Sequence, residues 1–290
     1  MATPTDNSYV VNADIENKFA CLSALPSLPV LLMDALQQLE GHHNIASMTT
    51  LVDKIGHDPA LVARLLRIAN SSFYGMSREI ASLREAIVVL GFNRVRELLI
   101  SICFSQALTA HHNPFDYKGF WHHSMAVADC SRQLASLIGI NPDIAFTAGL
   151  LHDIGQLVIV FLFPVFIATD TALHAEIPIN MTENERQFLC SDHAEIGGKA
   201  ALYWNFPVAI QEAIEQHETA PISSTPKSLG LLLYAVNLLM TEIMSWDDAD
   251  IQNREENLRV ALEILDIPMG QARLCADAGR QFADRIVAVL

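Results

Sequence analysis

Positive charge is scarce in this sequence. The chain has 18 Lys and Arg residues against 33 Asp and Glu residues, and its formal net charge is −15 at pH 7. A protein that binds nucleic acid through bulk electrostatics needs the opposite balance, because it neutralises phosphates with Lys and Arg. We therefore expect no nucleic-acid partner. The arginines between Arg64 and Arg96 are interleaved with glutamates, so we interpret this region as a solvated helix surface.

Cysteine is also sparse and is not arranged in pairs. The five cysteines are scattered, odd in number and form no Cys-x-x-Cys sequence. This pattern argues against a disulfide framework or a zinc knuckle and indicates buried thiols in a reducing compartment. The first twenty residues lack a basic stretch followed by an apolar core, so they do not resemble a secretory signal. We expect a cytoplasmic protein.

Alternating strand patterns are missing, whereas helical periodicity and helix caps are frequent. Hydrophobic residues make up 51% of the chain, which excludes disorder as its main state. The signals expected to bound helices are Pro29 with Gly41, Asp58 with Pro59, the capping box of Ser82 and Glu85 with Gly91, and a second box of Thr182 and Glu185. Residues 221–226 and 245–250 are predicted loops, and a last helical region follows. The sequence predicts an all-α fold.

The longest apolar run, from Ala145 to Phe163, contains a His-Asp doublet, His152 and Asp153. A membrane-spanning helix has a similar length, but an Asp near its centre costs about 2.5–3.5 kcal/mol on insertion scales. No Lys or Arg lies inside the run or within ten residues of it. We interpret the run as one buried core helix and expect no membrane association. Asp153 must then meet a partner, a cation or a wet cavity, because an unpaired buried charge costs several kcal/mol.

Three further histidines fall on apolar faces of predicted helices. His217 follows Ile210, Ala213 and Ile214 with helical spacing, and His193 and His123 share faces with other small or apolar residues. With His152, four separate helices would each present an imidazole inward. Imidazoles and a carboxylate suit a divalent transition metal. Four ordinary core histidines stay open as an alternative. His122 lies on a more polar face, and we expect it at the surface or behind the ligands.

Several motifs resemble those of known families. "FWHHS", "AGLLHDIGQLV", "HAEIG" and "AIEQHE" resemble the HD-domain superfamily of metal-dependent phosphohydrolases. Further upstream, "LPSLPVLL", "IGHDPALVARLLRIANSSFYG" and "SLREAIVVLGFNRVRELLI" resemble the HDOD family, the HD-related output domain of bacterial signalling proteins. The resemblance implies a helical lobe over residues 21–110 packed on an HD-like helical bundle over residues 111–245. An N-terminal extension, 1–20, and a C-terminal helical extension, 246–290, complete the expected organisation.

The resemblance also implies a set of metal ligands. The residues that match the family's ligands are His123, His152, Asp153, His193 and His217. Three positions depart from the pattern: Gln156 replaces the Lys after the doublet, Gln216 replaces the first residue of a His-His pair, and Asn237 aligns with the final Asp. A neutral amide is a poorer ligand than a carboxylate, and Gln156 removes a phosphate contact. We expect one weakly held divalent ion (iron, manganese, zinc or nickel) or none.

Two functions follow from the resemblance. We favour a non-catalytic output module of bacterial signal transduction, which presents a helical surface to a signalling protein partner. The alternative is a metal-dependent phosphohydrolase acting on a nucleotide or a cyclic dinucleotide. The region from Ile251 to Leu290 lies beyond the resemblance and is a candidate dimerisation or partner element, so a homodimer is an open alternative.

Overall fold

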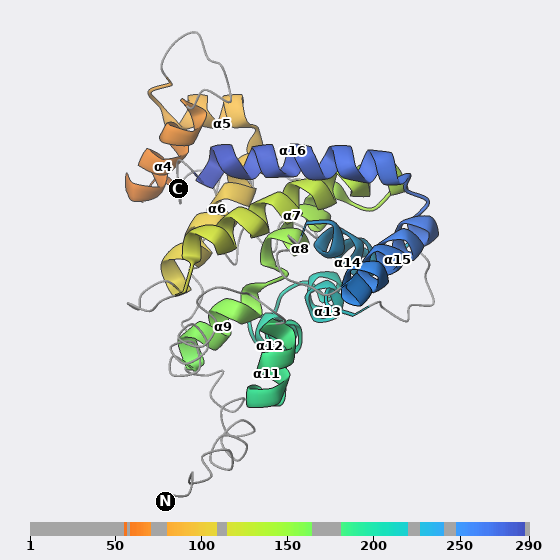
Figure 1. Ribbon diagram of the computed structural model, residues 1–290. Coiled ribbons are helices and arrows are strands. Elements are labelled where there is room, and N and C mark those ends of the chain that lie inside the picture. The colour runs from red at the N-terminus through yellow and green to blue at the C-terminus, as the bar shows by residue number, and fades with distance from the viewer. Residues whose placement is uncertain are drawn as a thin grey trace, which may run out of the picture.

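Helices form all the regular structure that the computed structural model describes. The described residues of the 290-residue chain are 55–56, 59–70, 80–108, 115–163, 181–219, 227–240 and 248–287. No strand occurs within these ranges, which confirms the all-α fold. The helices of Figure 1 are α4 (Pro59–Ala69), α5 (Leu83–Leu90), α6 (Phe92–Leu108), α7 (Tyr117–Ile138), α8 (Pro142–Leu151), α9 (Ile154–Leu162), α11 (Met181–Leu189), α12 (His193–Tyr203), α13 (Val208–Gln216), α14 (Leu229–Met240), α15 (Asp248–Leu265) and α16 (Met269–Val287).

The predicted N-cap of α5, Ser82, is confirmed, whereas Glu85 bonds the residue before the cap and not the cap itself. The side chain of Ser82 accepts a hydrogen bond from the backbone N–H of Glu85 at 3.2 Å, and the Glu85 carboxylate accepts one from the N–H of Ala81 at 3.3 Å. Gly91 ends the helix with a φ of 78°, a conformation that suits glycine. Local sequence therefore determines both ends of this helix.

The second predicted capping box is wrong. Met181 already belongs to α11, so Thr182 lies inside the helix and is not its N-cap. Glu185 instead accepts hydrogen bonds from the backbone and the ring of His193. The predicted signals at Pro29, Gly41 and Asp58, and the predicted loop 221–226, lie outside the described residues.

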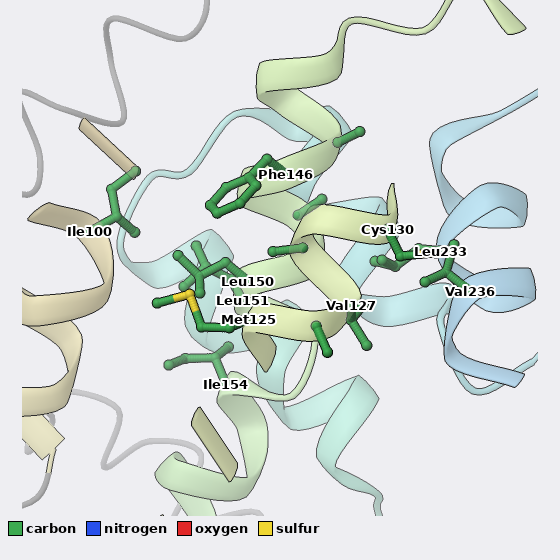
Figure 2. Close-up of a cluster of buried hydrophobic side chains, with 14 of the residues drawn as sticks. Ile100, Met125, Val127, Cys130, Phe146, Leu150, Leu151, Ile154, Leu233 and Val236 are labelled. Carbon is green, nitrogen blue, oxygen red and sulfur yellow. The ribbon is translucent and has the colours of Figure 1, made fainter. Parts of the chain in front are cut away.

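Helix α7 is the centre of the bundle. It packs against α8, α14 and α16, and Figure 1 shows α16 running along it. Gly279 of α16 permits this close packing, because a Cβ there would lie 2.6 Å from the backbone oxygen of Ala126. In Figure 2, Ile100, Met125 and Leu150 belong to the buried apolar cluster around α7. The core thus holds α7 and α8, which carry part of the predicted site, in fixed positions.

The apolar run from Ala145 to Phe163 is not one helix, so that prediction is corrected. Helix α8 ends at Leu151 and α9 begins at Ile154, which leaves the His-Asp doublet as the turn between them. The stretch Pro142–Leu162 is long and apolar enough to cross a membrane, but 83% of its most apolar window is buried inside the fold. The break directs the doublet into the bundle.

Two sequence interpretations fail for individual residues. Arg96 is fully buried and forms an ion pair with Asp143 at 3.1 Å, so the arginine-rich region is not simply a solvated surface. Its carboxylate partner comes from α8, which local sequence cannot reveal. Cys130 and Cys275 are buried free thiols as predicted, but Cys190 is exposed. The described cysteines form no disulfide.

The C-terminal helical region begins at Asp248, inside the predicted loop 245–250. It consists of two helices, α15 and α16, which pack back onto the bundle through α14 and α7. Arg254 of α15 is buried and donates hydrogen bonds to the backbone oxygens of Asn237, at 3.1 Å, and Leu238, at 2.7 Å. These carbonyls lie in the last turn of α14, where intrahelical donors are lacking, so α15 caps α14.

Candidate metal centre

The five predicted ligands meet in one place. His123 comes from within α7, whereas His152 and Asp153 form the turn between α8 and α9. His193 is the first residue of α12, and His217 directly follows α13. His123 lies in the interior of a helix and His193 is the first residue of one, and both rings face the pocket. His152 and His217 directly follow their helices, so the expectation that four helices each present an imidazole is corrected for these two. Helix ends place them, because their backbone amides and carbonyls are free to bond side chains.

Two histidines and one carboxylate oxygen form what we call the His123 set. The Nε2 atoms of His123 and His152 are 3.2 Å apart. Asp153 Oδ2 lies 3.3 Å from His152 Nε2 and 3.8 Å from His123 Nε2. His152 is fully buried, whereas 28% of the His123 side chain is exposed, so this set lies at the edge of the pocket.

The other oxygen of the same carboxylate belongs to a second group, the His193 set. The Nε2 atoms of His193 and His217 are 3.2 Å apart. Asp153 Oδ1 lies 3.3 Å from His193 Nε2 and 3.2 Å from His217 Nε2. Both histidines are buried. Asp153 thus joins two adjacent histidine pairs, one oxygen to each.

The remaining ring nitrogens fix which side of each imidazole faces the pocket. His152 Nδ1 lies 2.8 Å from the carbonyl oxygen of Gly149, and His217 Nδ1 lies 2.6 Å from that of Ile214. A carbonyl only accepts, so these Nδ1 atoms carry hydrogen and a neutral ring presents its Nε2 lone pair to the pocket. Metal-ligating histidines in proteins typically have this arrangement.

Glu185 supports His193 in the same way. Its fully buried carboxylate accepts hydrogen bonds from His193 Nδ1 at 2.7 Å and from the His193 backbone N–H at 2.8 Å. Sequence reasoning missed this role, because the Thr-x-x-Glu pattern predicts a helix cap. The contact between Glu185 and His193 is visible only in the folded structure.

Glu218 is a further pocket residue that sequence reasoning missed. Its Oε1 lies 3.5 Å from His217 Nε2 and 3.7 Å from His193 Nε2. Asn237 donates to the same oxygen at 2.8 Å, and Thr182 donates to Oε2 at 3.3 Å. The available signal was a carboxylate directly after His217 in the sequence "QHE".

The electrostatics of the pocket keep two of its carboxylates, Asp153 and Glu218, ionised. Burial raises the pKa of Asp153, but the charge of His152 and hydrogen bonds from three histidines outweigh it and hold that pKa well below its usual range. Burial likewise opposes ionisation of Glu218, yet the hydrogen bond and charge of His193 lower its pKa to about 2. Burial lowers the pKa of His193, but Glu185 and Asp153 raise it well above its usual value. The carboxylates therefore require positive charge from an imidazolium or a bound cation.

The donor set fits a divalent metal ion. Neighbouring ligands about 2.1 Å from one zinc ion lie about 3.0–3.4 Å apart, for octahedral and tetrahedral arrangements respectively. The separations within the His193 set, 3.2–3.3 Å, match this range. Imidazole Nε2 lone pairs that face one another across 3.2 Å repel unless a proton or a cation lies between them. Each histidine pair, with its oxygen of Asp153, could hold an ion.

The other singled-out residues take different places. Asn237, aligned with a family ligand, does lie in the pocket, where it bonds Glu218 and the ring of His123. Gln216 lies against Gly230 at the start of α14. His122 is partly exposed and its Nε2 lies 2.8 Å from Asp284 Oδ1, which confirms the predicted surface position.

Fold and site together define an all-helical domain of the HD type, with a His-Asp doublet at its centre. The model of the HDOD domain family matches residues 25–220, and the chain belongs to this family. An uncharacterized protein of Treponema pallidum (strain Nichols) is 28% identical over 201 residues, which are 68% of this chain and 38% of that protein. The chain therefore matches well under two thirds of that relative's length.

Solved structures share the fold. An HDOD domain protein of unknown function from Geobacter sulfurreducens has a TM-score of 0.73 and 21% identity, covering 94% of this chain and 99% of that one. A protein from Shewanella amazonensis SB2B, whose name proposes a phosphohydrolase, has a TM-score of 0.67 and 26% identity, covering 97% and 99%. One from Marinobacter aquaeolei VT8, whose name proposes signal transduction, has a TM-score of 0.73 and 21% identity, covering 99% and 66%.

Proposed function

We propose that this chain is an output module of bacterial signal transduction that presents a helical surface to a protein partner in the cytoplasm. Its HD-type pocket holds one divalent metal ion as part of the folded structure and does not hydrolyse phosphate esters. The candidate ligands are His123, His152, Asp153, His193 and His217, which form two sets that share Asp153, and one ion would be held by one of these sets. Membership of the HDOD family supports the signalling role. The convergence of donors that could hold an ion supports the metal.

The observation that carries the non-catalytic part is the neutral residue at position 156, beside the doublet; the cation that interacts electrostatically with the pocket among the described residues is Arg254, which acts on Glu218. Gln156 follows the doublet where the resemblance leads us to expect Lys. Among the described residues, the ion pairs of Asp153 and Glu218 are all with histidines, and none is with Lys or Arg. Phosphoryl transfer relies on such cations to balance developing charge. The pocket is thus better suited to an ion than to a phosphate ester.

The residues of the pocket would hold the ion and balance its charge. Asp153 lies between both histidine pairs, and the Nδ1 hydrogen bonds of His152 and His217 keep their rings oriented. Glu185 does the same for His193. A bound ion would supply Lewis acidity and positive charge at Asp153. Because the unfolded chain has no such site, the binding free energy would stabilise the fold.

One observation favours a second candidate function, a metal-dependent phosphohydrolase acting on a nucleotide or a cyclic dinucleotide. Asp153 directs one oxygen to each histidine pair, and a shared carboxylate is what two neighbouring ions need. Two-metal hydrolysis uses ions roughly 3.5–4 Å apart. The two functions differ in whether phosphate esters are turned over.

Thermal unfolding with and without chelator, paired with a hydrolysis assay, separates the two. We expect chelator to lower the wild-type melting temperature by about 2–4 °C for each kcal/mol that the ion contributes. Asp153→Asn should be insensitive to chelator, because it lacks the carboxylate that both histidine pairs share. Neither protein should hydrolyse bis(p-nitrophenyl) phosphate or a cyclic dinucleotide after loading with manganese, iron or zinc.

Two results would contradict the proposal. Metal-dependent hydrolysis by the wild type that disappears in Asp153→Asn would establish the phosphohydrolase instead. The proposed ion would also be contradicted if chelator left the melting temperature of the wild type unchanged and if the wild type contained no metal after purification without chelator. An Asp153→Asn variant at least as stable as the wild type would then fit a pocket of ordinary core residues, because the substitution removes a buried charge and keeps its shape.

A further inference from the structure

We infer that the single ion occupies the His193 set and that Glu218 is its fourth ligand. The inference rests on the proposed function, because it assigns a place to the ion that the pocket is proposed to hold. Glu218 is not among the ligands that the family resemblance implies. The structure nevertheless places its carboxylate against both histidines of one set and of that set alone.

Charge distinguishes the two sets. The His123 set has one carboxylate, Asp153, and its fourth neighbour is the neutral Asn237, which bonds His123. The His193 set has the same Asp153 and, in addition, Glu218. Two carboxylates match the charge of a divalent ion, and a carboxylate is a better ligand than an amide for a hard or borderline cation. The loss of an acidic ligand at position 237 is therefore balanced by Glu218 on the other side of the doublet.

Distances favour the same set. The two histidines and Asp153 Oδ1 are mutually 3.2–3.3 Å apart, within the spacing of ligands around one ion. Glu218 Oε1 is 3.5 Å from His217 Nε2 and 3.7 Å from His193 Nε2, so a shift of a few tenths of an ångström completes its approach. Among the two histidines and the Asp153 oxygen of the His123 set, the largest separation is 3.8 Å, between Asp153 Oδ2 and His123 Nε2, against 3.3 Å among the same three donors of the His193 set.

The surroundings of Glu218 are those of an oriented ligand. Asn237 and Thr182 each donate a hydrogen bond to its carboxylate. Ligating carboxylates are commonly held by such outer hydrogen bonds, which fix their direction. Asn237 thus acts as a positioning residue for Glu218, a task that needs an amide N–H and that an ionised Asp could not perform. This accounts for an Asn at the position where the family has an acid.

Zinc binding to the purified full chain tests the assignment. Isothermal titration with Zn²⁺ and metal content by plasma emission would be measured for the wild type, Glu218→Gln and His123→Gln. Glu215→Gln is the matched control, since it removes the same charge from an exposed position three residues earlier. Melting temperatures in chelator would establish that each variant folds.

We expect the wild type to bind one Zn²⁺ per chain and Glu218→Gln to bind it at least about tenfold more weakly, a loss of about 1.4 kcal/mol. His123→Gln and Glu215→Gln should stay within about threefold of the wild type.

Retention of wild-type affinity in Glu218→Gln, or its loss in His123→Gln, would overturn the assignment and leave the proposed metal pocket intact. Two equivalent ions per wild-type chain would also overturn it. A wild type that binds no Zn²⁺ would overturn both the metal pocket and this inference.

Discussion

Asp153 is the residue on which the pocket depends, because its two oxygens serve different histidine pairs. Glu185, Glu218 and the carbonyls of Gly149 and Ile214 then hold the histidines from behind or from the side. Burial and the neighbouring His152 lower the pKa of His123 to about 4.

That lowered pKa predicts how stability depends on pH. A histidine of the unfolded chain has a pKa of about 6.5. Between pH ~6.5 and ~4 the unfolded state therefore binds a proton at His123 more readily than the folded state does. The contribution of His123 to the free energy of unfolding is constant above pH ~6.5 and is lost as the pH falls from ~6.5 to ~4. We expect the metal-free wild type to lose stability over this range more steeply than His123→Gln. Urea unfolding in chelator at several pH values measures this, and parallel profiles would contradict it.

The convergence of the five candidate ligands in one pocket could be predicted from the sequence, but the residues that support them could not. Glu185 stands three residues after Thr182, a pattern that fits a helix cap as well as it fits a partner for His193. Glu218 is adjacent to a predicted ligand, yet its direction depends on Asn237 and Thr182, which belong to other helices. Local sequence determines residue type and spacing, whereas these roles depend on contacts between distant segments.

At the scale of elements, the break between α8 and α9 is what exposes the His-Asp doublet to the pocket. Apolar residues continue from α8 across the break into α9, so the sequence predicted a single helix. The structure ends α8 where the His152 ring bonds the Gly149 carbonyl. Helix α9 then meets α12 at Gly155, where a Cβ would lie 1.8 Å from the backbone oxygen of His193. Side-chain volume at this one position therefore controls how closely the segments that carry Asp153 and His193 approach each other.

This contact predicts a large effect of Gly155→Ala. The backbone of α12 cannot move away cheaply, so the substitution should cost at least the ~1–3 kcal/mol typical of overpacking and should weaken Zn²⁺ binding through His193. Gly270→Ala is the matched control, because Gly270 is likewise the second residue of its helix and has open space around its Cβ position. It should be neutral or stabilising by up to about 1 kcal/mol. Equal unfolding free energies for the two variants would contradict the close approach.

Over the whole molecule, the C-terminal helices belong to the same core as the pocket. The face of α16 that packs on α7 includes Phe282, which meets Phe146 edge-to-face at 6.3 Å between ring centroids. The Arg94 guanidinium lies 4.7 Å from the centre of the Phe282 ring. These contacts join α6, α8 and α16. The prediction that residues 251–290 form a dimerisation or partner element stays a prediction for the faces that α16 leaves exposed.

Phe282 is therefore expected to be important for stability. Phe282→Ala should lower the free energy of unfolding by about 3–5 kcal/mol, as for other buried aromatic residues. Leu274→Ala, on the same helix but 64% exposed, should change it by less than about 0.5 kcal/mol. Chemical denaturation of both variants tests this. A small loss for Phe282→Ala would mean that α16 is only loosely attached to the bundle.

The whole-molecule features also show where sequence reasoning ends. The all-α class followed from helical spacing and caps, because these are local properties. The burial of Arg96 did not, since Asp143 lies 47 positions further along the chain and reaches it only through the packing of α6 on α8. An interleaved run of Arg and Glu indicates a solvated surface, and only the packing of the neighbouring helices shows that one of its arginines is buried.

The shared carboxylate of Asp153 has a kinetic consequence. An ion held by Asp153, His193, His217 and Glu218 would join the turn before α9 to the residues that follow α13, so it would act as a clip across a long stretch of chain. Clips that close long loops remove the most freedom from the unfolded ensemble. Neither half of the bundle could then open fully before the ion departs. The lifetime of the folded, metal-loaded chain would be governed by ion release, and free metal in the cell would set how long each molecule persists before it is degraded.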